Sequence, residues 1–299
     1  MATWFLVLHW PSGHWEHRVF LSGTPFASVT VTMAMVALQS SATALSALNT
    51  ALDVTANNLA NMNTVGFKAS RTNFEDLLYL HKQQPGVENA IGDKSPCGVQ
   101  VGLGVKVSST QLDFTEGAPL QTGRPLDMQI DGFGFFQVQV EPSLGNTAYT
   151  RAGNFALNAD REIVLANDQG RRLQPVITID PNATAISIDN SGRVYATIAG
   201  STQPQLQGQI QLATFPNPGG LLQIGENLYT ETNGSGPPVT GEPGIDQRGQ
   251  IREGFLENSN VDPTREMIDL IRTQRAFEFN SQVIRAADDS LRSVSQLRR

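Results

Sequence analysis

Apolar residues recur every seven positions near both ends of the chain, which is the spacing of helices that pack along one face. In the first of these segments Ala42, Asn49 and Ala56 follow leucines by four positions, giving a 4-3 pattern. The pattern predicts one helix over residues 35–66 and a second over residues 263–299. The residues expected to form the packed seams are Leu38, Leu45, Leu52 and Leu59 in the first helix and Leu270, Phe277, Ile284 and Leu291 in the second.

The two predicted helices differ in charge. Asp53 is the one charged residue between Ala34 and Met62, whereas the segment after Pro263 holds seven arginines and five acidic residues. A soluble helix that packs on a single core normally has a charged outer face. One interpretation is therefore two amphipathic helices on one globular core, and the other is helices that pair with each other and with copies from other chains. The missing charges favour the second interpretation, in which the seams are the assembly interface.

Local signals mark the ends of these helices. Asp262 followed by Pro263 is typical of an N-cap and a first helical residue. Gly66 is expected to stop the first helix, because glycine adopts the left-handed conformation that follows many helix ends.

Between the helices, residues 67–262 alternate apolar and polar positions in short runs separated by turn residues. Such runs predict an antiparallel β body, so the fold class is α+β with the terminal helices as a coiled-coil domain. We divide the body into an outer β domain, residues 120–224, and a connecting region, residues 67–119 and 225–262. The clearest expected strands cover residues 99–101, 105–107, 135–140, 176–179, 186–188, 194–198 and 209–212.

Residues 1–34 differ in composition from the rest of the chain. All three tryptophans and three of the four histidines lie within its first half. The segment lacks the basic start and small-residue cleavage site of a secretory signal. It is a tail without a role in the core, a partner-binding segment, or a mistranslated leader. The change of pattern at Met33 and Met35 favours a leader or disordered tail, with the assembled protein starting near these methionines.

Composition and charge disfavour several functional classes. The net charge is −7 and the pI is about 5.1, so the chain lacks the basic surface that nucleic-acid binding needs. No apolar run reaches the length of about 18 residues that predicts a membrane helix. Cys97 is the single cysteine, and His81 is the one histidine after the leader, in a stretch expected to end a helix. Neither a nucleophile elbow nor a phosphate-binding loop occurs. We expect no enzymatic activity, no cofactor and no metal.

Several segments resemble, in order along the chain, the motifs of the flagellar basal-body rod and hook protein family. The N-terminal signature is LDVTANNLANMNTVGFK at residues 52–68, and the resemblance extends over residues 35–299. The stretch GVQVGLGV at residues 98–105, and the length of 265 residues counted from Met35, are most similar to the distal-rod members. The other matching segments are residues 120–127, 130–138, 149–155, 254–262 and 266–278.

The resemblance implies a structural subunit of the distal rod, which self-assembles into a helical tube and transmits motor torque to the hook. The implied partners are copies of the chain itself, adjacent rod and hook subunits, the surrounding ring proteins of the basal body, and the flagellar export apparatus. The implied location is the periplasm-spanning basal body, reached by export without a cleaved signal peptide. The alternatives are a proximal rod or hook subunit of the same family, and a secreted β-domain adhesin or enzyme.

Overall fold

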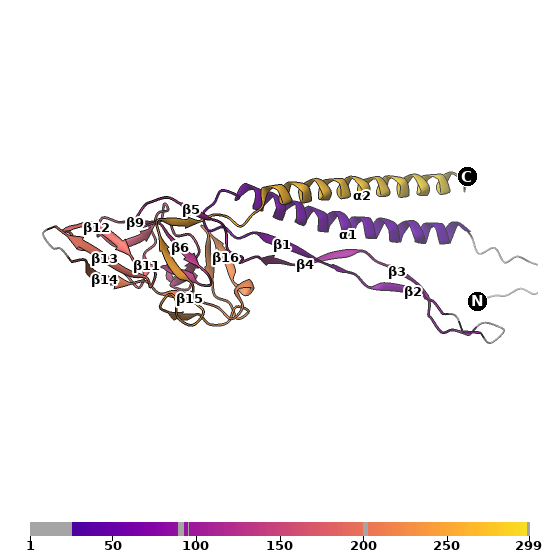
Figure 1. Cartoon of the computed structure of the whole chain (residues 1–299). Helices are drawn as coiled ribbons and strands as arrows, with labels where there is room; N and C mark the ends of the chain where they lie inside the picture. The colour runs from indigo at the N-terminus through magenta and orange to yellow at the C-terminus, as the bar shows by residue number, and fades with distance from the viewer. Residues whose placement is uncertain (1–25, 89–92, 95, 200–202, 298–299) are drawn as a thin grey trace, which may run out of the picture.

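The structure is a computed structural model that describes residues 26–297 except 89–92, 95 and 200–202. Two long helices and a ribbon of strands project together from a β body (Figure 1). Helix α1, Phe26–Ala60, runs towards the body, and helix α2, Pro263–Leu297, runs back beside it in the opposite direction. The architecture is α+β, as the sequence pattern predicts.

The ends of the helices near the body have defined capping contacts. The Asp262 carboxylate accepts hydrogen bonds from the backbone N–H groups of Thr264 and Arg265 at 3.0 and 3.4 Å, which confirms the predicted N-cap. The prediction for Gly66 was wrong, because α1 ends at Ala60 and a series of turns follows. Gly66 has a φ of +70°, and a β-carbon there would lie 2.5 Å from the Ala152 backbone nitrogen. Its role is therefore to let the chain approach the body closely.

A strand ribbon leaves the body beside α1 (Figure 1). Its strands form two antiparallel pairs, β1 with β4 and β2 with β3. The backbone N–H of Val105 donates to the Thr43 hydroxyl at 3.4 Å, so the ribbon contacts α1 partway along the helix. The strands of the ribbon are β1 Ser70–Asp76, β2 Tyr79–Gln83, β3 Val99–Gly102 and β4 Val105–Leu112.

The body consists of small antiparallel sheets around one main core. The largest sheet has seven strands, in the order β16-β17-β8-β7-β15-β18 with β11 also paired to β7, and a three-stranded sheet has the order β12-β13-β14. Three further pairs are β9 with β10, β6 with β19 and β5 with β20. The strands are β5 Pro119–Gln121, β6 Met128–Asp131, β7 Phe135–Gln139, β8 Thr147–Thr150, β9 Phe155–Leu157, β10 Ile163–Leu165, β11 Leu173–Gln174, β12 Ala183–Ile188, β13 Arg193–Ile198, β14 Gln205–Gln209, β15 Leu212–Thr214, β16 Leu222–Gly225, β17 Leu228–Thr230, β18 Val239–Gly241, β19 Gln250–Glu253 and β20 Phe255–Glu257, with short 3-10 turns at Pro142–Leu144 and Pro218–Gly220.

Two hydrophobic clusters hold the body together. The larger one joins both sheets through side chains such as Phe136, Leu212 and Val194, all fully buried. The smaller one is aromatic, and its rings meet edge to face: the centroids of Tyr149 and Phe215 are 4.8 Å apart. Such pairs add about 0.5–1.5 kcal/mol each beyond the burial of their surface.

Three local predictions were wrong. Residues 176–179 form no continuous strand, because their partner segment bends at Arg161, whose φ is +62°. A bridge between Glu162 and Thr178 is what remains of that pairing. Residues 209–212 are split between β14 and β15, since the chain passes there from one sheet to the other. His81 is exposed on strand β2 rather than at a helix end.

Candidate assembly interface

The seam residues predicted on α1 border its buried face. Leu38, Leu45, Leu52 and Leu59 are all half-buried. The most buried α1 residues are smaller, with exposed fractions of 5% or less at Ser41, Ala47 and Asn58. Small side chains allow neighbouring elements to approach closely, and the leucines lie beside this strip. Ala42, Asn49 and Ala56, the other half of the predicted 4-3 pattern, are exposed in the single chain.

The seam residues of α2 form a continuous half-buried stripe. Thr273, Asn280 and Ala287 are also half-buried and complete a 4-3 pattern with the predicted seam. The stripe begins at Glu266, whose carboxylate accepts a hydrogen bond from the Asn58 side chain of α1 at 3.1 Å. Burial raises the pKa of Glu266 above its ordinary value. Leu270, Phe277, Ile284 and Leu291 all belong to this stripe.

The opposite face of α2 carries a second apolar stripe, which the seven-residue spacing does not predict. The most exposed side chain in this stripe is that of Phe279, which is 63% exposed. At about 100° per residue, these five residues fall within about 160° of the helix circumference, on the side away from the seam. Exposed apolar patches of this kind mark interaction surfaces. We call this set the outer stripe, and its members are Met267, Ile268, Ile271, Phe279 and Val283.

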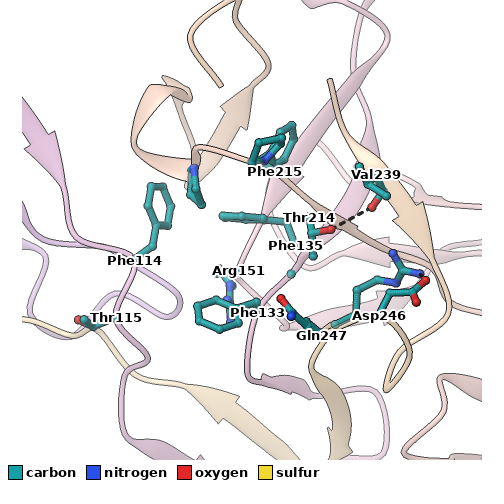
Figure 2. Close-up of a pocket in the computed structure, with 14 residues that line it drawn as sticks. Phe114, Thr115, Phe133, Phe135, Arg151, Thr214, Phe215, Val239, Asp246 and Gln247 are labelled. Carbon is teal, nitrogen blue, oxygen red and sulfur yellow. Dashed lines mark hydrogen bonds and ion pairs between the residues drawn. The ribbon is translucent and has the colours of Figure 1, made fainter. Parts of the chain in front are cut away.

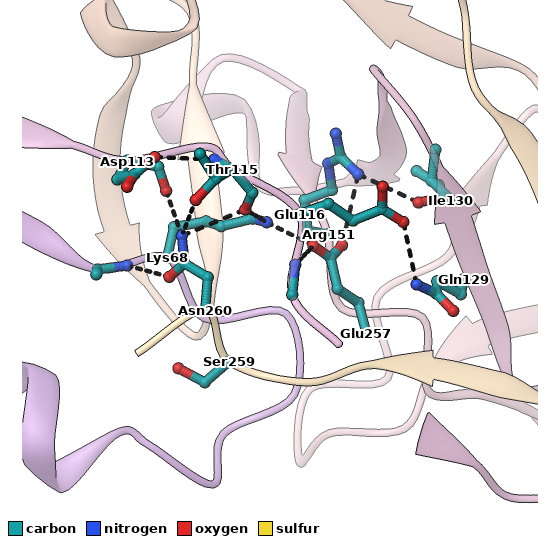
Figure 3. Close-up of polar contacts among 12 residues, drawn as sticks. Lys68, Asp113, Thr115, Glu116, Gln129, Ile130, Arg151, Glu257, Ser259 and Asn260 are labelled. Carbon is teal, nitrogen blue, oxygen red and sulfur yellow. Dashed lines mark hydrogen bonds and ion pairs between the residues drawn. The ribbon is translucent and has the colours of Figure 1, made fainter. Parts of the chain in front are cut away.

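A buried ion cluster joins the helices to the body (Figure 3). The Lys68 ammonium, after α1, forms an ion pair with the Glu257 carboxylate on β20, just before α2, and both side chains are 0% exposed. Arg151, which follows β8 of the body and is 3% exposed, reaches the second oxygen of the same carboxylate at 3.4 Å. The cluster therefore connects the two chain segments that lead to the helices with a body strand.

Hydrogen bonds satisfy most of the remaining polar atoms in this ion cluster. Lys68 Nζ donates to the Thr115 carbonyl at 2.6 Å, and the Gly117 N–H donates to Glu257 at 3.0 Å. Arg151 donates to the Gly132 carbonyl at 2.8 Å, and its guanidinium lies 5.3 Å from the centre of the Phe135 ring. Burial lowers the pKa of both Lys68 and Arg151, while Glu257 opposes the shift in each case. The single carboxylate therefore stabilises two buried cations.

Neutral contacts around the ion cluster fix the same junction. The Gly66 N–H donates to the Glu257 carbonyl at 2.8 Å. Asn58, nearly fully buried at the end of α1, both donates to and accepts from the Ser70 backbone, at 2.8 and 3.0 Å. Asn260 accepts from the Ala69 N–H at 2.8 Å. Short polar side chains thus hold the start of the ribbon against the segment that leads to α2.

No sequence pattern indicated that Lys68, Arg151 and Glu257 meet. Lys68 and Glu257 are 189 residues apart, and Arg151 and Glu257 are 106 apart, so no local spacing connects them. Each lies in a different segment that resembles a rod and hook family motif. The structure shows that these segments converge on one cluster.

The described residues show no membrane helix or metal cluster. Neither long helix contains a stretch that is apolar enough to cross a membrane. Among these residues, no group of three or more His, Cys, Asp or Glu side chains is placed to hold a metal ion.

Three family models match the chain. They are the flagellar hook protein FlgE/F/G D1 domain at residues 129–196, the flagellar basal body rod FlgEFG protein C-terminal region at residues 252–297, and the flagella basal body rod protein at residues 38–68. The matches cover α1, the middle of the body and α2.

Curated relatives match over nearly their full length. The chain is 46% identical to the flagellar basal-body rod protein FlgG of Caulobacter vibrioides over 265 residues, which are 88% of this chain and 100% of the relative. It is 38% identical to FlgG of Bacillus subtilis, over 84% of this chain and 94% of that protein. With FlgF of Caulobacter vibrioides the identity is 34%, over 76% of this chain and 83% of the relative. Within one organism, the similarity to FlgG thus exceeds the similarity to FlgF.

Proposed function

Because the chain belongs to the flagellar basal-body rod protein family, as a structural subunit of the distal rod, we propose that its terminal helices form the tube through two apolar faces. The inner face is the predicted seam, where Leu52 and Phe277 lie. The outer face is the outer stripe of α2, which packs against the helices of neighbouring copies. The subunit polymerises with itself and with adjacent rod and hook subunits.

The outer stripe is the observation that carries this proposal. In the single chain, α2 already packs beside α1, yet Phe279 and Ile271 remain 63% and 46% exposed on the other side. Fully burying a Phe or Ile side chain stabilises by about 1.5–3 kcal/mol, so covering the exposed parts contributes about 1–2 kcal/mol each. Repeated at every subunit, contacts between two different faces build an open helical filament when the rotation between neighbours does not close into a ring.

The uncharged exposed face of α1 supports the same proposal. Ala42, Asn49 and Ala56 are exposed there, and Asp53 is the only charged side chain between Ala34 and Met62. A neighbouring helix can cover such a face without desolvating charges, which is costly. We propose that copies of the chain cover this face in the tube.

The ion cluster supports a role in torque transmission. A rod subunit must pass a twisting force between its helices and its outer body without turning at the joint. Lys68, Arg151 and Glu257 tie the two helix-bearing segments to a body strand inside a dry environment. We propose that this junction carries torque by packing and ion pairing alone, with no catalytic activity.

The placement of the body indicates where the ring proteins would bind. The three-stranded sheet β12-β13-β14 lies at the end of the molecule away from the helices (Figure 1). We propose that this end faces the surrounding ring proteins when the helices form the inner tube. We also propose that the flagellar export apparatus delivers the chain unfolded, without a cleaved signal peptide.

Complementation of a strain that lacks the native protein tests the assembly role of the outer stripe. Phe279→Asp should abolish rods and swimming, because a buried carboxylate in the helix contact loses its hydration. Gln274→Asp is the matched control, since Gln274 is exposed on α2 but lies outside the outer stripe. The proposal fails if Phe279→Asp cells assemble full-length rods, or if both variants lose them equally.

A further inference from the structure

The β body contains an aromatic cavity that its own chain does not fill. Its volume is about 590 Å³, which is ample for several side chains. Figure 2 shows phenylalanines from three separate parts of the chain around it: Phe114, Phe133, Phe135 and Phe215. Phe114, Phe135 and Phe215 pack edge to face, with centroids 5.3 and 5.8 Å apart. Aromatic side chains of this kind are enriched at the centres of protein interfaces.

Phe133 lies at the rim of this cavity rather than in the core. It is 71% exposed, although it stands in a motif whose next two phenylalanines are buried. Gly132 and Gly134 on either side have φ values of +110° and +138°, a conformation that side-chain-bearing residues rarely adopt. The backbone is thus built to turn Phe133 outward. Val239 on the other side of the cavity is 53% exposed.

The start of strand β2 and the residue before it present apolar side chains that the described part of the chain leaves largely exposed. Leu78, Tyr79 and Leu80 are 83%, 48% and 44% exposed. A two-stranded pair alone in water is marginally stable, so the β2–β3 pair needs a neighbouring surface. Figure 1 shows that it extends away from the body, beside the helices, so it does not reach the cavity of its own chain.

We propose that the aromatic cavity receives the segment Leu78–Leu80 from a second copy of the chain, a contact that rests on the rod function proposed above. The two surfaces match in hydrophobicity. They also match in charge, since Asp246 on the rim is 76% exposed while its partner Arg248 is 6% exposed, and His81 and Lys82 directly follow the apolar segment. The contact joins two different surfaces, so it propagates along an open filament. It is also continuous with the helix interface, because the ribbon contacts α1 through Thr43.

Disulfide trapping in assembled rods tests this contact. In a Cys97→Ser chain, the paired variant Leu80→Cys and Val239→Cys should give a ladder of covalent oligomers when isolated rods are oxidised. Each copy then carries one cysteine that faces the copy on one side and one that faces the copy on the other side, so crosslinking should continue beyond dimers. The matched control replaces Val239→Cys by Leu222→Cys, which is 57% exposed on β16 outside the cavity.

The outcomes separate the contact from the rod function. A ladder in the cavity pair, with less than a tenth as much in the control pair, supports the proposal. Normal rods without a ladder, or with equal ladders in both pairs, overturn it and leave the rod function intact. Absence of rods when the unmodified chain is expressed overturns the rod function itself.

A second pair of variants tests the cavity without cysteines. Phe133→Asp should reduce the number of rods per cell at least tenfold, whereas Leu222→Asp should leave it unchanged. Both side chains are mostly exposed, so both purified proteins should unfold at the temperature of the unmodified chain. Full rod numbers with Phe133→Asp would overturn the proposed contact.

Discussion

Replacing Lys68 by methionine tests how much the ion cluster contributes to the free energy of unfolding. The substitution keeps an unbranched side chain but removes the ammonium that pairs with Glu257, where both groups are 0% exposed. Breaking a buried ion pair by removing one partner costs about 3–5 kcal/mol. Glu257 keeps Arg151 at 3.4 Å and the Gly117 N–H at 3.0 Å, so we expect the lower end, about 3 kcal/mol.

Urea unfolding followed by circular dichroism measures this loss in the purified chain. The surface variant Lys106→Met is the matched control, because the Lys106–Glu75 pair is 3.2 Å long and about half exposed on both sides. Exposed pairs of this kind contribute about 0.2–1 kcal/mol. The two lysines thus differ in burial rather than in chemistry.

A double variant separates ion pairing from packing. Adding Glu257→Gln to Lys68→Met removes the charge of the carboxylate, and the one amide oxygen can accept from either Arg151 or Gly117, which bind different oxygens of Glu257. The double variant should therefore be less destabilised than the sum of the two single variants, by at least about 1 kcal/mol. The reasoning is refuted if Lys68→Met costs no more than Lys106→Met, or if the single effects simply add.

Four further predictions concern pH, assembly, order and the start of the chain. Burial raises the pKa of Tyr229 to about 12. The stability that the neutral, buried phenol contributes is present below its ordinary pKa of 10.0 and is lost as the pH rises towards 12. Tyr229→Phe should therefore reduce the loss of folding stability that urea titrations at alkaline pH measure. Leu52→Asp or Phe277→Asp should abolish rods while the body keeps its unfolding transition, and swimming cells would contradict the seam. Hydrogen exchange should be fast over residues 35–62 and 264–299 in dilute monomer and slow in the polymer; equal protection in both states would mean that the helices are complete before assembly. Mass spectrometry of isolated basal bodies should find an N-terminus near Met33 or Met35, and peptides containing Trp4 would contradict it.

Sequence patterns predicted features that depend on neighbouring residues. The two helices, the Asp262 cap and strands such as β7 and β13 follow from periodicity and capping chemistry, and the structure contains them. Residues 176–179 had the same alternating pattern but form no continuous strand, because their pairing with residues 161–163 is limited to one bridge and stops at Arg161, whose φ is +62°. A strand needs a partner as well as a pattern, and the partner is not visible locally.

The functional surfaces also differ in whether a local sequence pattern predicts them. The outer stripe was readable in principle, since Ile268, Ile271 and Phe279 lie at helical spacing, but the seven-residue count drew attention to one face alone. The ion cluster was not readable, because its partners are brought together by the fold. A lysine or glutamate inside an apolar core is normally excluded by its desolvation cost, so local chemistry alone favours exposed positions for such residues.

The pairing of β6 with β19 has a consequence for how this molecule can change over evolutionary time. The chain enters the outer part of the body along β6 and leaves it along β19, and the two strands are antiparallel neighbours with Met128 opposite Glu253 and Asp131 opposite Gln250. Everything between them is therefore an insertion whose two ends are already joined. Insertions with adjacent ends can be lengthened, shortened or exchanged at little cost to the parent fold. The tube-forming helices and the exterior of the rod can thus diversify largely independently on a single polypeptide, as long as the inserted part keeps Arg151 for the ion cluster.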